Sequence, residues 1–394
     1  MPRLLFVAAF ILSLGLFSKT VHADEKAAPK EWTFLLFLNG HNNLDSFGSY
    51  NINQMEEVGS TNDLNMVVQW ASLKNKKTQR LLVQKDNNTQ KVTSPIVQTM
   101  DPVDMGDYKQ LVEFVRWGVQ NYPAKHYFIA VWNHGNGWHR VNGVQTRDIS
   151  YDDVSGHHIT TEQLGLAMDE SAKIIGHKVD VYGSDACLMA MAEVATQMKN
   201  SVDFFVGSEE TEPGYGWPYN TFMNRWASRP QSTSAEVATA ITEEYVKAYD
   251  GGIYGNQDVT FSAMDLSKLD GFLASLTNLK TSLASLGTAD MKSVKSAVSG
   301  TQSFTYSDYK DLSHFVGKIS SLSISSTVLS DVNSAIADLV IAKGATGEYE
   351  STSKGISIWM PNTASTLSTY RDRYAQLEIN KATDWLSFLD KLNN

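Results

Sequence analysis

The chain has 394 residues, of which 42% are hydrophobic and one is a cysteine, and its formal net charge at pH 7 is −10. An acidic chain without a run rich in lysine and arginine is unsuited to nucleic acid or an anionic membrane surface, so we exclude both as partners. A single cysteine excludes an internal disulfide framework, and this length supplies one large core with a smaller appendage.

The N-terminus has the pattern of a secretory signal peptide. Arg3 precedes the uncharged apolar run Leu4–Phe17, and residues 21–23 (VHA) have the small-residue spacing of a cleavage site. The run is shorter than the roughly 20 residues that a membrane span needs. We therefore expect residues 1–23 to be removed and the mature chain to be exported, to the periplasm or out of the cell, without stable membrane insertion. A retained anchor is the alternative.

After this leader, apolar strands alternate with helical patterns. Residues 32–38 form a continuous apolar run, as expected of a central strand in a parallel sheet, and residues 66–70 and 80–84 predict two further strands. Apolar residues at helical spacing between Leu111 and Val119 predict a helix. This alternation predicts an α/β fold with a mostly parallel sheet covered on both faces.

A histidine follows the next predicted strand. The segment from Tyr127 to Trp138 reads YFIAVWNHGNGW, so an apolar strand ends directly before His134 and Gly135. Glycines at positions 135 and 137 let a substrate backbone approach closely. We therefore expect His134 at the carboxyl end of a strand, beside space for a ligand.

The single cysteine, Cys187, lies in a similar position in the segment VDVYGSDACLMAMA at 179–192. Residues 179–182 predict a buried strand and residues 188–198 a helix, so we place Cys187 where the strand ends and the helix begins. The unpaired N–H groups and the positive dipole at a helix start favour a thiolate over a thiol. For a lone cysteine the alternative is a small buried hydrophobe.

Together, His134 and Cys187 have the parts of a cysteine acyl-transfer enzyme. In a parallel α/β sheet the carboxyl ends of neighbouring strands meet at one edge, where ligands bind, so the two residues are expected to be neighbours. A histidine within reach can take the thiol proton and return it to a leaving amine. A lone cysteine with a histidine about 50 residues upstream is itself a pattern of catalytic thiols.

Two irregular segments adjoin these residues. Residues 137–158 are polar without clear periodicity, and loops longer than about 15 residues are usually functional or exposed. Residues 209–219 are dense in proline, glycine and aromatic residues, which is typical of a rigid loop suited to line a substrate pocket.

The glycines at 251 and 252 mark a boundary between residues 24–250, the expected catalytic domain, and a C-terminal region at 251–394. This region predicts a strand at 259–264, long helices between 267 and 345, and a final amphipathic helix. Alternating apolar residues at 355–360 predict a strand that returns to the sheet.

Several motifs, in order along the chain, resemble the clostripain family of cysteine peptidases, which are relatives of caspases, gingipains and legumains. The core motifs are WNHGNGW at 132–138 and SDACLMA at 184–190, supported by EWTFLLFLNGHNNLD at 31–45, GSEETEPGYGWPY at 207–219 and GISIWMP at 355–361. The resemblance implies a caspase-like α/β/α sandwich with a mostly parallel central sheet and a helical C-terminal region. It also implies an exported cysteine endopeptidase that acts on proteins or peptides.

The resemblance further assigns roles to single residues. Cys187 would be the nucleophile and His134 the acid/base of a dyad. The backbone N–H groups of Gly135 and Cys187 would form the oxyanion hole, which fits the unobstructed N–H of a glycine. In such enzymes the region between the two catalytic residues can be cut, so Arg147 is a predicted processing site, with an ordinary surface arginine as the alternative.

Specificity is predicted from the same resemblance. Members that cleave after arginine or lysine carry one acidic residue two positions before the cysteine and another in the loop that corresponds to EPGxGW. Asp185 matches the first position, whereas Tyr215 stands at the second and would narrow or reshape the substrate pocket. The loop acids Glu209, Glu210 and Glu212 are candidates to compensate, and a solvated surface acid is the alternative for each.

No motif predicts a metal cofactor. His139 and the adjacent pair His157 and His158 lack the spacing of a zinc site. Four acids offer carboxylate oxygens, and some relatives depend on calcium, but the DxDxDG spacing is missing; these acids are Asp148, Asp152, Asp153 and Glu162. We expect no cofactor, with calcium as the alternative.

Two functions of other classes stay open. A binding protein on the same fold would keep Cys187 buried and unreactive. A thiol transpeptidase or amidase would use the same dyad on a different acceptor and would give a ligated rather than a hydrolysed product.

Overall fold

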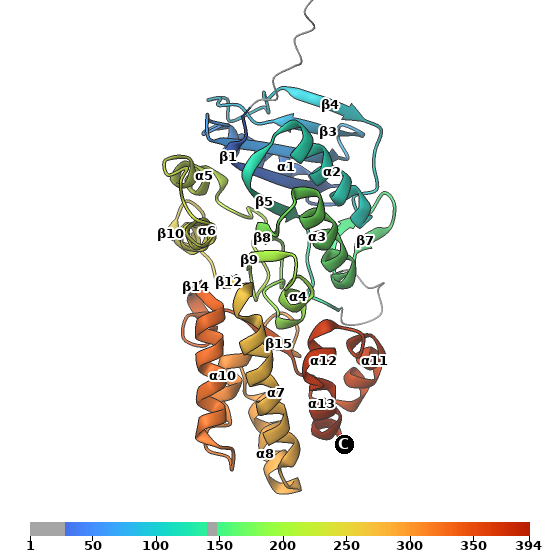
Figure 1. Ribbon diagram of the computed structural model, residues 1–394, viewed down its shortest axis with the longest axis vertical. Helices are drawn as coiled ribbons and strands as arrows, with labels where there is room; N and C mark the ends of the chain where they lie inside the picture. Colours follow the sequence, from blue (N-terminus) through green and yellow to red (C-terminus); the bar gives the residue numbers. More distant parts are fainter. Residues whose placement is uncertain (1–27, 140–147) are drawn as a thin grey trace, which may run out of the picture.

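The computed structural model describes residues 28–139 and 148–394 (Figure 1). The signal peptide predicted at 1–23 and the arginine predicted as a processing site at position 147 lie outside these residues. Among the helices of the described part, none has the length and apolar character to cross a membrane.

Within the described residues, nine strands form one mixed sheet in the order β14-β12-β9-β8-β5-β1-β2-β3-β4. These strands are β1 (Lys30–Gly40), β2 (Leu64–Ser72), β3 (Lys77–Leu82), β4 (Ile96–Met100), β5 (Ala124–Trp132), β8 (Val179–Asp185), β9 (Val202–Gly207), β12 (Thr260–Asp265) and β14 (Val340–Ala345). The central strands from β9 to β2 are parallel, and both edges are antiparallel. The predicted α/β fold is confirmed, with its parallel part confined to the centre of the sheet.

Helices cover both faces of the sheet because side chains alternate along each strand. On β1, Phe34 and Leu36 belong to one core with α1, α5 and α6, whereas Leu35 and Phe37 belong to the other with α2, α3 and α4. These helices are α1 (Asp45–Glu56), α2 (Tyr108–Asn121), α3 (Thr161–Ile175), α4 (Ala192–Gln197), α5 (Tyr219–Ala227) and α6 (Ser234–Tyr249). The result is a three-layer α/β/α sandwich.

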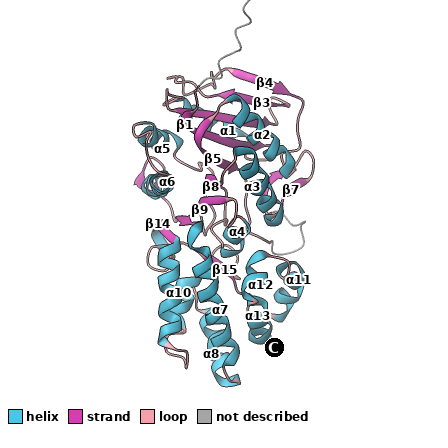
Figure 2. Cartoon of the chain, in the orientation of Figure 1, coloured by secondary structure: helices cyan, strands magenta, loops and turns pink. Residues whose placement is uncertain are grey.

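The C-terminal region is mainly helical, and its helices lie beyond the β14 edge of the sheet. They are orange and red in Figure 1 and cyan in Figure 2. Its helices are α7 (Leu269–Ser285), α8 (Thr288–Ser299), α9 (Leu312–Lys318), α10 (Ser326–Leu339), α11 (Ala364–Tyr374), α12 (Glu378–Thr383) and α13 (Trp385–Asn393), with short 3-10 turns at Leu266–Lys268 and Gly347–Tyr349. Because β12 and β14 join the central sheet, strands from both sides of residue 250 share one sheet.

The strand predicted at 355–360 does not return to the central sheet, so that prediction is wrong. The observed strand β15 (Ser357–Trp359) pairs antiparallel with β13 (Tyr309–Asp311) in a separate two-stranded ribbon. Alternating apolar residues indicate a strand with a buried face, but they do not identify the strand that pairs with it. The late edge strand of the sheet is β14 instead.

Small hairpins complete the described elements. The polar segment without periodicity contains one, formed by β6 (Ile149–Asp152) and β7 (His157–Ile159). Another, formed by β10 (Asp250–Gly252) and β11 (Gly255–Asn256), lies at the glycine boundary. Strands of two to four residues are too short to show an alternating pattern in the sequence.

Candidate active site

The two predicted catalytic residues extend from neighbouring parallel strands. Trp132 at the end of β5 lies opposite Asp185 at the end of β8, and the N–H of Asn133 donates to the carbonyl oxygen of Asp185 at 3.2 Å. His134 lies two residues after Trp132, and Cys187 lies two residues after Asp185. Both line a pocket of about 240 Å³ at the carboxyl edge of the sheet, where α/β folds bind ligands.

Gly135 lies directly against the cysteine. A Cβ atom at this position would collide with the carbonyl oxygen of Cys187 and would lie 3.0 Å from the Cβ of Ala186. The close approach of the two backbones therefore requires glycine. The structure thus brings His134, Gly135, Asp185 and Cys187 to one place.

His134 is held by residues that the sequence did not single out. Its Nε2 lies 2.8 Å from Oδ1 of Asn43, and its ring stacks on Tyr151 with centroids 5.7 Å apart. Asn43 belongs to the polar turn after β1, the strand beside β5, so its place at the end of a parallel strand was the signal that could have identified it. Tyr151 comes from the hairpin β6–β7, which gave no sequence signal.

Cys187 does not lie at a helix start, so that prediction is wrong. The helix α4 begins at Ala192, and between the two residues Leu188 has a left-handed backbone (φ 64°) and Met191 is extended. Helical hydrogen bonding cannot pass through a left-handed leucine. The positive end of the α4 dipole therefore lies too far away to stabilise a thiolate, because this effect falls off within the first turn.

The thiol is instead held by the loop after β9. The N–H of Glu212 donates to Sγ of Cys187 at 3.2 Å, and Sγ lies 3.9 Å from the carbonyl oxygen of Glu212. Although Cys187 is partly exposed to the pocket, burial of its sulfur raises the pKa of the thiol to about 12, and the charges of Glu212 and Glu210 act in the same direction. The thiol is therefore protonated at neutral pH and needs a base to become a nucleophile.

Two buried acids face each other on the pocket wall. Asp185 accepts the hydroxyl of Tyr219 at 2.7 Å, and burial raises the pKa of its carboxyl to about 7. Glu212 lies within hydrogen-bonding reach of Asp185, and burial followed by the neighbouring charge raises its pKa well above the usual range. The backbone of Ala186 opposes this shift by hydrogen bonding to the carboxyl of Glu212. The pair therefore holds at least one proton at neutral pH.

The other loop residues predicted for the pocket lie elsewhere. Tyr215 is not among the side chains that line the pocket, and its carbonyl oxygen accepts from Nδ2 of Asn51 at 3.0 Å. Glu209 accepts from Gly355 N at 2.9 Å and from Ser353, and Glu210 accepts from the hydroxyl of Tyr349 at 2.8 Å. These two glutamates fasten the loop to the C-terminal region, whereas Glu212 alone of the three faces the pocket.

The four acids considered for calcium are largely engaged by basic side chains. Arg373 binds Asp148 at 2.5 Å and Glu162 at 2.7 Å, and Oδ2 of Asp152 lies 2.9 Å from Nδ1 of His41. Over residues 28–139 and 148–394, no group of three or more histidine, cysteine or acidic side chains is arranged to hold a metal ion.

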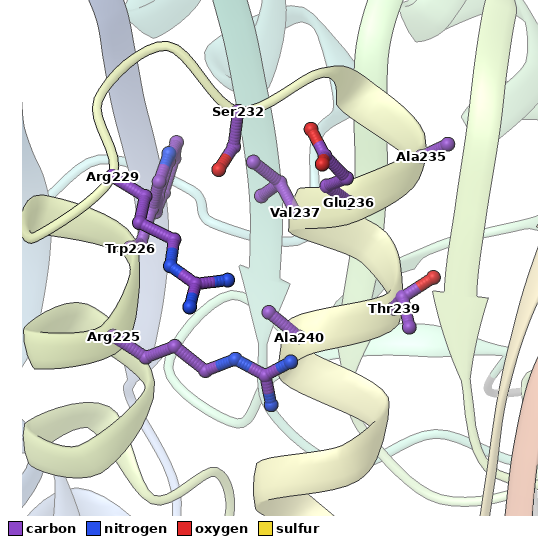
Figure 3. A pocket seen from close by; sticks show the side chains of 9 residues that line it. All are labelled: Arg225, Trp226, Arg229, Ser232, Ala235, Glu236, Val237, Thr239 and Ala240. Carbon is purple, nitrogen blue, oxygen red and sulfur yellow. The ribbon is translucent and has the colours of Figure 1, made fainter.

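A different hollow, of about 200 Å³, lies between α5 and α6 (Figure 3). Arg225 in the last turn of α5 and Arg229 just after the helix extend toward α6. Arg225 pairs with Glu243 at 2.6 Å and with Glu244 at 3.4 Å. Its lining includes none of the residues predicted for catalysis. The candidate active site is therefore the pocket that holds the cysteine and the histidine.

Comparison with known proteins agrees with this geometry. The model of the clostripain family matches residues 36–392. Clostripain from Hathewaya histolytica is 34% identical over 130 residues, a match that spans 31% of this chain and 24% of that protein.

Two solved structures share the fold over nearly their whole length. One is a secreted C11 cysteine protease from Bacteroides thetaiotaomicron in complex with an irreversible peptide inhibitor, with a TM-score of 0.69 and 22% identity over 90% of this chain and 99% of that one. The other is an inactive zymogen of a C11 protease from Parabacteroides distasonis, with a TM-score of 0.70, 20% identity and the same two coverages. The caspase-like sandwich is thereby confirmed, and the chain belongs to the clostripain family of cysteine peptidases.

Proposed function

We propose that the chain is an exported endopeptidase in which Cys187 is the nucleophile and His134 the acid/base. The observation that carries this proposal is the convergence of both residues on one pocket from adjacent parallel strands, with Gly135 against the backbone of Cys187. The leader-like pattern at residues 1–23 supports export.

The chemistry follows from the environment of each group. A buried thiol with a raised pKa cannot ionise alone, so His134 takes its proton as the sulfur attacks the substrate carbonyl. The N–H groups of Gly135 and Cys187 then stabilise the oxyanion. His134 returns the proton to the leaving amine, and water releases the acyl group from Cys187.

We also propose that the acid pair selects arginine or lysine as the residue whose carbonyl is attacked, called P1. Asp185 accepts the hydroxyl of Tyr219, and Glu212 lies within hydrogen-bonding reach of Asp185 on the pocket wall. A guanidinium or ammonium group would bind the oxygens of both carboxyls and would take the place of the proton that the pair holds. Glu212 would then supply the second negative charge that Tyr215 lacks. The bond after Arg147 would suit this specificity and is our proposed processing site.

The test is hydrolysis of a peptide library by the mature chain and by Cys187→Ala, with the cut sites read by mass spectrometry. We expect cuts after arginine or lysine that disappear in the variant. Cuts after other residues that still depend on Cys187 would keep the mechanism and refute the basic specificity. Ligated products would favour a transpeptidase, and an unreactive thiol without any cuts would favour a binding protein.

A further inference from the structure

The loop that carries Glu212 also presents an exposed group of aromatic side chains. Tyr215 is 45% exposed and Tyr50 on α1 is 38% exposed. Their ring centroids are 5.8 Å apart, and Tyr215 also meets Phe47 edge-on at 6.2 Å. We call these three side chains, Phe47, Tyr50 and Tyr215, the aromatic cluster.

The aromatic cluster is held rigidly from behind. The ring of Tyr215 stacks on the buried ring of Tyr254 at 5.0 Å and 6°, and Asn51 binds the carbonyl oxygen of Tyr215. The hydroxyl of Tyr50 accepts from Nε2 of Gln54 at 3.2 Å. Exposed aromatic faces that are already fixed in place lose little conformational entropy when they bind a ligand.

Two glycines join the cluster to the acid pair. A Cβ at Gly214 would lie 2.9 Å from Cζ of Phe47, and a Cβ at Gly216, which has φ 64°, would lie 2.8 Å from Oδ1 of Asp185. Both glycines line the catalytic pocket. Tyr215 lies between these two glycines in the chain. One glycine contacts Phe47 of the cluster and the other contacts Asp185 of the proposed P1 site, so the two surfaces are continuous.

This continuity identifies the part of a substrate that would reach the cluster. The leaving amine must depart close to His134, which donates its proton, whereas the cluster adjoins the acid pair that would bind the P1 side chain. Residues that precede P1 are therefore the ones positioned beside the cluster. Its side chains carry no formal charge at neutral pH, and the nearby carboxyls disfavour an acidic side chain.

We propose that the aromatic cluster binds an aliphatic or aromatic side chain of the substrate within the three residues before P1. This inference rests on the proposed function and extends it from one residue to a short motif. Contact with an aliphatic side chain removes apolar surface of both partners from water, which is the source of the preference.

The experiment uses the full mature chain and peptides with arginine at P1 that differ only by leucine or serine at one of the three preceding positions. We expect leucine to raise kcat/KM about tenfold at one position. Tyr215→Ala and Tyr50→Ala should each reduce that preference to less than about threefold. Leu166→Ala, which truncates an exposed apolar residue on α3, is the control and should leave it unchanged.

Binding of the same peptides to Cys187→Ala, followed by fluorescence anisotropy, separates this inference from the proposed function. Tighter binding of the leucine peptide without hydrolysis by the unmutated chain would support the cluster and refute the peptidase. Equal affinities, a preference that survives both tyrosine variants, or selection of lysine or arginine in place of leucine would overturn the inference. If thermal unfolding shows that Tyr215→Ala is not folded, Tyr50→Ala decides.

Discussion

The hydroxyl of Tyr309 lies 2.6 Å from the carbonyl oxygen of Asn136, two residues after the proposed catalytic histidine, and it also accepts the N–H of His139 at 3.2 Å. Tyr309 is on β13, whose partner β15 donates the N–H of Ser357 to the carbonyl oxygen of Ala190 at 3.0 Å. The ribbon β13–β15 thus contacts both the loop after His134 and the loop after Cys187. The C-terminal region therefore contacts the backbone that follows each member of the proposed dyad.

Tyr309→Phe tests this role because it removes the hydroxyl and keeps the buried ring. We expect a loss of about 1 kcal/mol in the free energy of unfolding from the lost hydrogen bonds, together with a lower kcat and a nearly unchanged KM. Tyr245→Phe is the matched control, since it removes a buried hydroxyl without a described partner and should lower neither quantity. An unchanged kcat in Tyr309→Phe would show that the ribbon is a structural support only.

Gly135→Ala places a methyl group against the carbonyl oxygen of Cys187. The backbone must shift to accommodate it, and the proposed oxyanion donor shifts with it. We expect kcat to fall at least about 100-fold, as for the loss of one oxyanion-hole donor. Gly271→Ala on α7, where a Cβ meets no atom within 4 Å, is the control and should keep full activity. Retained activity in Gly135→Ala would argue against an oxyanion hole at this position.

Asn43→Ala removes the partner of Nε2 of His134. The imidazole keeps its stacking on Tyr151 but gains rotational freedom, so we expect kcat to fall about tenfold with little change in KM. Steady-state kinetics measures both parameters, and Asn278→Ala on the exposed face of α7 serves as the control. If KM rises instead while kcat is retained, Asn43 contacts the substrate rather than orienting the histidine.

The acid pair predicts a pH-dependent choice of P1. Because the pKa of Asp185 is raised to about 7, the pair gains negative charge as the pH rises through this value. The ratio of kcat/KM for an arginine peptide to that for its citrulline analogue should therefore increase between pH 6 and pH 8. Taking the ratio cancels the titration of the dyad. In Asp185→Asn we expect a smaller and flatter ratio, and a flat ratio in the unmutated chain would contradict the proposed role of the pair.

A second buried acid predicts a pH-dependent stability. Glu193 accepts the N–H of Trp359 at 3.0 Å, and burial raises the pKa of its carboxyl from 4.5 to about 7. An acid that is protonated in the folded state stabilises the fold at low pH, and that contribution is lost as the pH rises through about 7. Glu193→Gln keeps an acceptor but cannot ionise. Urea unfolding at pH 5 and pH 8 should show a smaller loss of stability in this variant than in the unmutated chain, and equal losses would refute the assignment.

The sequence by itself predicted that His134 and Cys187, the proposed dyad, lie together. His134 and Cys187 each follow an apolar run and a short turn, and such local patterns are enough to predict strand ends in a parallel sheet. Asp185 and Gly135 were predicted from the resemblance to the clostripain family, and each is close in the chain to one of these two residues. Residues that are close in the chain must also be close in space, so their proximity could be predicted without knowing how distant segments pack.

Only the tertiary structure decided the environment of these residues. The left-handed backbone at Leu188 prevents a helix from starting at Cys187. Burial beneath the loop that carries Glu212 raises the pKa of the thiol. Three glutamates of one loop looked equivalent in sequence, yet Glu209 and Glu210 bind the C-terminal region and Glu212 faces the pocket. An irregular loop has no periodicity that orients its side chains, so their directions depend on contacts with residues that are distant in the chain.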